Sequence, residues 1–156
     1  MIENRSAPPG PIVPSLVYDD VAAAVEWLCE VFGFSERLRW GPPDDFTAQL
    51  DVGGGSIFVR GPRTGHGTAE RLTFRAPRPD ELSHTLMVQV EDVDRHHDHA
   101  MGCGAEILLP VETYGFGERQ YSARDVGRHA WTFTQSVADV DPQEWIPHTL
   151  GDGSGS

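Results

Sequence analysis

The chain contains no lysine: all 12 of its basic residues are arginine, against 24 acidic residues. The resulting formal net charge of −12 predicts an acidic surface. Such a surface repels nucleic acid and anionic membranes and attracts cationic ligands. We therefore expect neither a nucleic-acid partner nor a membrane partner, with solubility as the simplest role of the charge.

Long apolar runs are also missing. No stretch approaches the length of a membrane span, and the opening segment MIENRSAPPG lacks the apolar centre of a signal peptide. The only cysteines of the chain are Cys29 and Cys103, which is a weak basis for a disulfide framework. These absences predict a cytoplasmic protein with buried, inert thiols, although a Cys-His nucleophile pair stays open.

The elements that are present occur twice in the same order. The first half predicts a helix over 19–34, capped by Asp19 or Asp20 and ended by Gly33, and the second half predicts a helix over 91–104. Strand-like composition precedes and follows each helix. The predicted strands are 12–18, 35–40, 46–52 and 56–60 in the first half, and 83–90, 105–111, 119–125 and 129–134 in the second.

Short sequence matches support an internal duplication. Asp51-Val52-Gly53 returns as Asp125-Val126-Gly127, and Asp19-Asp20-Val21 returns as Glu91-Asp92-Val93. We therefore expect one domain over 12–135, built from two βαβββ modules at 12–60 and 83–135. A Gly-, Pro- and Arg-rich loop, 61–82, joins them as a linker or a lid, and tails of 1–11 and 136–156 flank the domain.

Two βαβββ halves with these segments resemble the vicinal oxygen chelate superfamily, which includes glyoxalase I, extradiol dioxygenases, fosfomycin-resistance enzymes and bleomycin-resistance proteins. The resemblance is carried by residues 16–34, 86–107 and 117–135, although the family's Asp-Pro-x-Gly turn reads Asp125-Val126-Gly127-Arg128 here. It implies an α+β fold in which each module curls a mixed sheet into a cup and paired cups form a cavity. In the enzymes of this family, that cavity holds a divalent metal.

The resemblance also assigns four metal-ligand positions, on the first and last strand of each module. In this chain they are occupied by Val13, Phe58, Thr85 and Thr132. Divalent metal sites need imidazole, carboxylate or thiolate donors, which none of these side chains supplies. His84 is one residue away from the third position, but it would be a single ligand. We therefore predict no metal and no other cofactor.

Strand alternation predicts which side chains line the cavity. The aliphatic face of strand 83–90 and the residues Trp131 and Phe133 should pack under the helices, which leaves the more polar side chains inward. The predicted ligand-binding residues are Val13, Phe46, Phe58 and Arg60 in the first half, and Thr85, Met87, Gln89, Gln120, Ser122 and Thr132 in the second. The two halves thus line the cavity unequally, one mostly apolar and one polar.

Two further motifs are candidate functional segments. Tyr114 and Phe116, in the turn 112–118, are predicted to close over a planar ligand, with a plain hairpin turn as the equal alternative. The run His96-His97-Asp98-His99 is expected to form a solvated helix face, because two imidazoles rarely hold a specific ion.

The sequence thus predicts a metal-independent binding protein of the bleomycin-resistance type, forming a homodimer. It would sequester or sense a small organic ligand, with a cationic aromatic compound as one candidate. The alternative is a metal-dependent lyase, isomerase or dioxygenase of the same superfamily. A metal-free enzyme with Glu118 or His84 as general base stays open.

Overall fold

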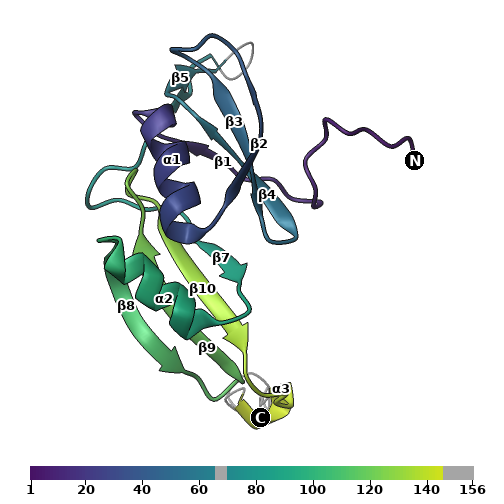
Figure 1. Cartoon of the computed structure of the whole chain (residues 1–156), viewed down its shortest axis with the longest axis vertical. Coiled ribbons are helices and arrows are strands. Elements are labelled where there is room, and N and C mark those ends of the chain that lie inside the picture. Colours follow the sequence, from purple (N-terminus) through teal and green to yellow (C-terminus); the bar gives the residue numbers. More distant parts are fainter. Residues whose placement is uncertain (66–69, 146–156) are drawn as a thin grey trace, which may run out of the picture.

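The computed structural model describes residues 1–65 and 70–145. Residues 66–69 of the predicted linker and 146–156 of the predicted tail lie outside the described part. The first module forms a four-stranded sheet in the order β1-β4-β3-β2, with β1 parallel to β4 (Figure 1). Its elements are β1 (Ser15–Val17), α1 (Val21–Phe32), β2 (Ser35–Trp40), β3 (Thr47–Val52) and β4 (Gly55–Arg60).

The second module repeats this topology in the order β7-β10-β9-β8, with β10 parallel to β7. The two βαβββ units and the α+β class predicted from the sequence are therefore confirmed. The elements are β7 (Leu86–Gln89), α2 (Val93–Gly102), β8 (Glu106–Thr113), β9 (Glu118–Arg124) and β10 (Ala130–Ser136), followed by the short helix α3 (Pro142–Trp145).

The linker contains a feature that the sequence did not reveal. Strands β5 (Arg63–Thr64) and β6 (Thr73–Phe74) pair as a small antiparallel sheet within the segment that was predicted to be a loose loop. Strands of two residues are too short to show an alternating pattern, so periodicity cannot detect them.

Side-chain caps fix the beginnings of both long helices. The Asp20 carboxylate accepts from the Ala23 backbone N–H at the start of α1, and Asp92 accepts from Arg95 in the same way at the start of α2. Gly33, with φ of 77°, ends α1 in the left-handed conformation that glycine adopts without strain. No helix of the described ranges is both long enough and apolar enough to cross a bilayer.

Both helices cover the same side of the two sheets, and the apolar core continues from one module into the other (Figure 1). Phe32 at the end of α1 contacts Trp131 and Phe133 of β10, with ring centroids 5.9 and 4.7 Å apart. Trp131 and Phe133 are both buried, as the alternation predicted. Because the modules share these aromatic side chains, each module is stabilised by its contact with the other.

The carboxylate of Asp125 connects the two modules at their boundary. It is 5% exposed and accepts hydrogen bonds from the Tyr18 hydroxyl at 2.6 Å and the Trp131 indole N–H at 2.8 Å. Its other oxygen accepts from the backbone N–H groups of Gly127 and His129. Burial, reinforced by this carboxylate, raises the pKa of Tyr18, so the hydroxyl stays protonated and donates.

The repeated Asp-Val-Gly motif therefore has different roles in the two modules. A Cβ atom on Gly127 would lie 2.2 Å from the Tyr18 ring, so this glycine allows the ring to reach Asp125. Gly53 has φ of 60° and no neighbour at its Cβ position, so it serves only the β3–β4 turn. One oxygen of Asp51 is buried without a hydrogen-bond partner among the described residues.

We expect Asp125→Asn to lower the free energy of unfolding by about 3 kcal/mol, because the new amide N–H groups would face donors in a buried site. Urea denaturation followed by tryptophan fluorescence measures this loss. Asp51→Asn is the matched control from the other repeat and should cost less than about 0.5 kcal/mol. Equal losses in the two variants would contradict the assigned role of Asp125.

The histidines of α2 form a second connection between the modules. The Nε2 atom of His96 lies 2.9 Å from the Phe32 carbonyl oxygen, and its Nδ1 atom lies 2.7 Å from the Tyr121 hydroxyl. The Nε2 atom of His99 lies 2.8 Å from the Glu30 carbonyl oxygen. These carbonyls at the end of α1 have no partner within the helix. The expectation of a solvated His96–His99 face is therefore wrong for His96, because α2 packs beside the end of α1.

Acid is expected to weaken this connection. Burial lowers the pKa of His96, although the hydrogen bond to Phe32 opposes the shift. The folded protein then binds fewer protons than the unfolded chain, so the free energy of unfolding is highest above the ordinary histidine pKa of about 6.5 and falls as the pH decreases below it. Denaturation across this range should show a shallower slope in His96→Gln, which keeps a donor for Phe32. An unchanged slope would show that another group causes it.

Candidate functional site

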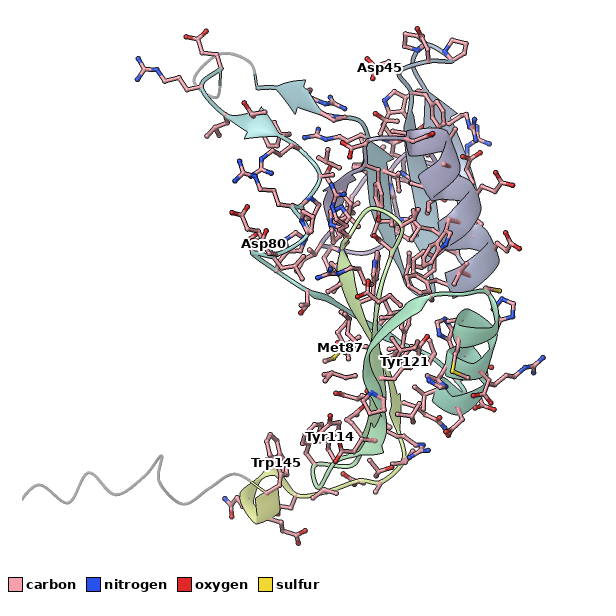
Figure 2. The ribbon with its side chains drawn as sticks, turned by 90° about the vertical axis from the view of Figure 1, so that its left-hand side faces the viewer. Asp45, Asp80, Met87, Tyr114, Tyr121 and Trp145 are labelled. Atoms are coloured by element: carbon pink, nitrogen blue, oxygen red, sulfur yellow. The ribbon has the colours of Figure 1, made fainter. Side chains whose placement is uncertain are left out.

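The two sheet faces opposite the helices are the candidate binding surfaces, and we call them the open faces. In module 2, Figure 2 shows Met87 pointing away from the helix side, whereas Tyr121 lies between the sheet and α2. Tyr121 is 1% exposed and Met87 is 64% exposed. Strand alternation therefore commits one face of each sheet to the core and leaves the other available.

The open face of module 2 combines apolar and hydrogen-bonding side chains. Strand pairing places Met87 beside Thr132 and Thr132 beside Ser122, and the hydroxyls of Thr132 and Ser122 lie 2.8 Å apart. Gln89 and Gln120 flank Thr134 on the same face. The structure thus brings together five predicted residues, with exposed Thr85 just before β7.

A carboxylate lies at one end of this face. Glu118, on β9, accepts hydrogen bonds from the hydroxyls of Thr134 and Ser136 on β10. These two hydrogen bonds lower the pKa of Glu118, so the side chain stays negatively charged at neutral pH. The face can therefore offer a cationic group a charged acceptor beside neutral ones.

The open face of module 1 is more aromatic. Phe58 on β4 lies edge-on to Trp40 on β2, with ring centroids 5.5 Å apart. Gln49 lies opposite Phe58 in the sheet, and its amide oxygen accepts from Arg37. Phe58 therefore lies on the open face of module 1, with a second aromatic ring beside it.

The other predicted residues of module 1 have different surroundings. Val13 is half-buried just before β1, and the Arg60 guanidinium lies 5.0 Å from the centre of the Phe74 ring in the linker. Burial, followed by the charge of Arg63, lowers the pKa of Arg60. Arg60 thus interacts with the linker rather than with the other predicted residues.

The placement of Phe46 on the open face is wrong. Phe46 is 6% exposed, belongs to the core and has the Arg39 guanidinium 4.2 Å above its ring. Ala48, which pairs with buried Val59, also faces the core. Because alternate residues of a strand face opposite sides, the predicted assignment of β3 was one residue out of phase.

Tyr114 and Phe116 lie at the far end of module 2, where Figure 2 shows Tyr114 and Trp145 at the same end of the molecule. Their rings stack with centroids 5.3 Å apart, and Phe116 also contacts Trp145 of α3 at 5.2 Å. The structure does not place them with Phe58, and in this conformation they stack on each other.

The N-terminal segment is held against module 1. Arg37 donates to the backbone carbonyls of Arg5 and Ala7 as well as to Gln49. These contacts explain why Gln49, on the open face, is only 1% exposed. Part of the predicted tail of residues 1–11 therefore covers one side of this face.

The residues at the four family metal positions do not fit a divalent ion. Phe58 packs against Trp40, and Thr132 shares a hydrogen bond with Ser122. Val13 and Thr85 add a hydrocarbon and a neutral hydroxyl, which are poor ligands for the metals that this family uses. Nowhere in residues 1–65 and 70–145 do three His, Cys, Asp or Glu side chains gather in a metal-binding arrangement.

Two exposed apolar side chains on the open faces are not among the predicted ligand-binding residues. Leu109 of β8 pairs with Ser122 and is 54% exposed, and Trp40 is 48% exposed beside Phe58. The register of β8 shifts on both sides of Leu109, so simple alternation could not assign its face. Trp40 closes an alternating run, Leu38 and Trp40, that would have indicated its side.

Comparison with known proteins agrees with this architecture. The family model described as the Glyoxalase/Bleomycin resistance protein/Dioxygenase superfamily matches residues 11–133. TioX from Micromonospora sp. ML1 has 34% sequence identity and a TM-score of 0.62, over 85% of this chain and 100% of TioX.

Two more distant proteins match most of the chain. The uncharacterized protein Mb0911c of Mycobacterium bovis is 27% identical over 135 residues, which are 84% of this chain and 86% of the relative. TnmS3, described as an antibiotic binding protein from Streptomyces sp. CB03234, has 17% identity and a TM-score of 0.60, over 80% of this chain and 93% of TnmS3. The chain therefore belongs to the glyoxalase/bleomycin resistance protein/dioxygenase superfamily.

Proposed function

We propose that this protein binds a small organic ligand on its open faces without a metal ion, and so sequesters or senses that ligand. The observation that carries the proposal is the composition of these faces. They expose large apolar side chains, Met87, Leu109 and Trp40, beside hydrogen-bonding groups and the Glu118 carboxylate. An apolar surface with a few oriented polar groups suits an amphipathic organic molecule.

The charge distribution favours a cationic aromatic ligand. Phe58 and Trp40 offer aromatic surface, and Glu118 offers a stable negative charge within an acidic molecule. Aromatic rings bind both planar rings and cations through their negatively charged faces. The antibiotic-binding description of TnmS3 is consistent with this use of the fold, although its low identity supports the fold alone.

The metal-dependent lyase, isomerase or dioxygenase is the less favoured function. Such enzymes need an ion to polarise a substrate oxygen, and the four family positions offer no imidazole, carboxylate or thiolate. His84 remains a single exposed imidazole before β7. The side chains present therefore support binding better than metal-assisted catalysis.

A homodimer in the cytoplasm is part of the proposal. Within one chain the two open faces belong to separate sheets, and each leaves large apolar side chains exposed. A second copy that covers these faces would remove apolar surface from water and enclose the ligand.

Binding of a cationic dye should depend on Phe58 but not on Phe46. We expect acridine orange or ethidium to bind and anionic fluorescein to bind less, as measured by fluorescence anisotropy. Phe58→Ala should weaken dye binding by about 1–3 kcal/mol through the loss of aromatic contact. Phe46→Ala should instead lower the free energy of unfolding by about 3 kcal/mol, with dye affinity unchanged at temperatures where it is folded. A Phe58→Ala variant that binds the dyes normally would contradict the site.

Native mass spectrometry tests the dimer and the metal in one measurement. Protein dialysed against divalent ions without chelator should appear as two chains with no stoichiometric metal, because the family positions lack donors. A His97→Ala/His99→Ala variant controls for ions held by the outer helix. About one ion per chain that survives in this variant would favour the enzyme, and a monomeric spectrum would contradict the dimer.

A further inference from the structure

Residues 5–11 lie against the open face of module 1, and we call them the latch. Arg37 of β2 donates to the backbone carbonyls of Arg5 and Ala7. The same guanidinium donates to the amide oxygen of Gln49, whose side chain belongs to this face and is buried. Figure 1 shows the N-terminal chain passing beside β4 before it runs away from the sheet. The latch therefore covers part of the surface that is proposed above to bind a ligand.

The latch is held by few contacts. Within the described ranges, the only hydrogen bonds between residues 1–11 and the rest of the molecule come from Arg37. Every latch residue except Pro8 is exposed, so no apolar side chain anchors the segment in the core. Gly10 lies against β4, because its Cβ position would be 3.5 Å from the Gly55 Cα atom. A segment with so few contacts can detach while the module stays folded.

Two more polar side chains lie beside Gln49 on the same face. Asp51 of β3 pairs with Ser56 of β4, two residues along each strand from the pair of Gln49 and Phe58. Side chains two residues apart in a strand point to the same side of the sheet, so Asp51 and Ser56 face away from the core. Ser56 is nevertheless only 4% exposed. We call Gln49, Asp51 and Ser56 the covered row.

The covered row keeps hydrogen-bonding atoms that the protein does not use. Ser56 Oγ and Asp51 Oδ1 are buried and have no partner among the described residues. The latch around Gly10 has the sequence PPGP over residues 8–11, so three of these four residues have no backbone N–H to donate. Burial of acceptors without donors costs free energy. A molecule that brings donors to these atoms recovers that free energy and so competes with the latch.

We propose that the latch is a gate: it competes with the ligand for this end of the open face, and the bound ligand displaces it. The gate rests on the open-face binding proposed above and adds a hydrogen-bonding subsite to it. Arg37 and Asp51 give this subsite one charge of each sign, so it selects hydrogen-bond donors rather than a net charge. The ligand places amino or hydroxyl groups on the covered row and its planar part on Phe58 and Trp40.

The latch can be tested without any ligand. Ser56→Cys places a thiol of similar size in the covered row, and the rate at which iodoacetamide modifies it reports how often the latch opens. Cys103 is exposed and serves as the internal reference in every variant. Peptide mass spectrometry measures the modification of the two thiols separately.

Two variants, each made in the Ser56→Cys background, should open the latch by different routes. Arg37→Gln removes the guanidinium that holds the latch, and Gly10→Ala places a side chain where φ is 93°. Either change should accelerate modification of the covered thiol about fivefold. Arg95→Gln removes an equal charge from an exposed position of α2, and Gly102→Ala adds a methyl group in open space. Neither control should change the rate.

A pair of cationic dyes identifies what the uncovered row binds in the chain that keeps Ser56. Proflavine and acridine orange share a planar ring system and a positive charge, but the amino groups of acridine orange are methylated and cannot donate. Gly10→Ala should tighten proflavine binding about fivefold, and acridine orange binding less, as measured by fluorescence anisotropy. Adding Asp51→Asn should remove most of this gain. Asp44→Asn, at an exposed carboxylate between β2 and β3, should leave it.

The two measurements separate the gate from the function proposed above. Unchanged thiol modification in both Arg37→Gln and Gly10→Ala, with normal dye binding, overturns the latch alone. Faster modification without tighter proflavine binding overturns the gate, because the uncovered row then holds no ligand. If no dye binds any variant, the open-face function fails and the gate fails with it.

A second readout applies if Ser56→Cys does not fold. The chain contains no lysine, and Arg5 is its first arginine, so trypsin cleaves first in the sequence at the latch. Arg37→Gln and Gly10→Ala should then accelerate the loss of residues 1–5, as measured by intact mass spectrometry, because an undocked segment is cleaved faster. Equal cleavage rates in these variants and in the unaltered chain would overturn the latch.

Discussion

The carboxylate of Asp125 is the interaction on which the boundary between the modules depends. It accepts from Tyr18, which follows β1, from Trp131 on β10 and from two backbone N–H groups of its own turn. A buried carboxylate is stable only when such donors surround it, so all of its partners must stay in position together. This charged group thereby helps to fix β1 against module 2, together with the contact between His129 and the Val17 carbonyl of β1.

This constraint explains why the duplicated halves have diverged unequally. Gly127 must stay small because the Tyr18 ring occupies the space beside it, and the Arg128 backbone adopts a left-handed conformation in the same turn. Asp51 and Gly53 have no such partners, so they serve a plain hairpin turn. Arg128 then donates to the Pro77 carbonyl, which links the same turn to the linker between the modules.

Local sequence patterns predicted the helices and strands well. They could not predict the contacts between the two modules. Asp20 and Gly33 mark the ends of α1 through capping, and the alternation of Trp131 and Thr132 gives the correct faces of β10. Phe46 was misplaced because the alternation was assigned one residue out of phase: Phe46, Ala48 and Leu50 are all buried in the core. The burial of His96 depends on Phe32, 64 residues earlier, and no local pattern carries that information.

The same distinction between local patterns and long-range contacts applies to the candidate site. The polar open face of module 2 could be predicted because Ser122 and Thr132 lie in regular strands, where period two decides the face. The register shifts of β8 concealed Leu109, and the loose composition of the linker concealed the pairing of β5 with β6. His129 shows why such long-range contacts escape sequence analysis. Its Nε2 is paired with Val17, 112 residues earlier in the chain, and only this pairing makes Nδ1 an acceptor without a partner. The sequence does not show which of the two ring nitrogens of a histidine carries the hydrogen, because the hydrogen bonds made in the fold decide it.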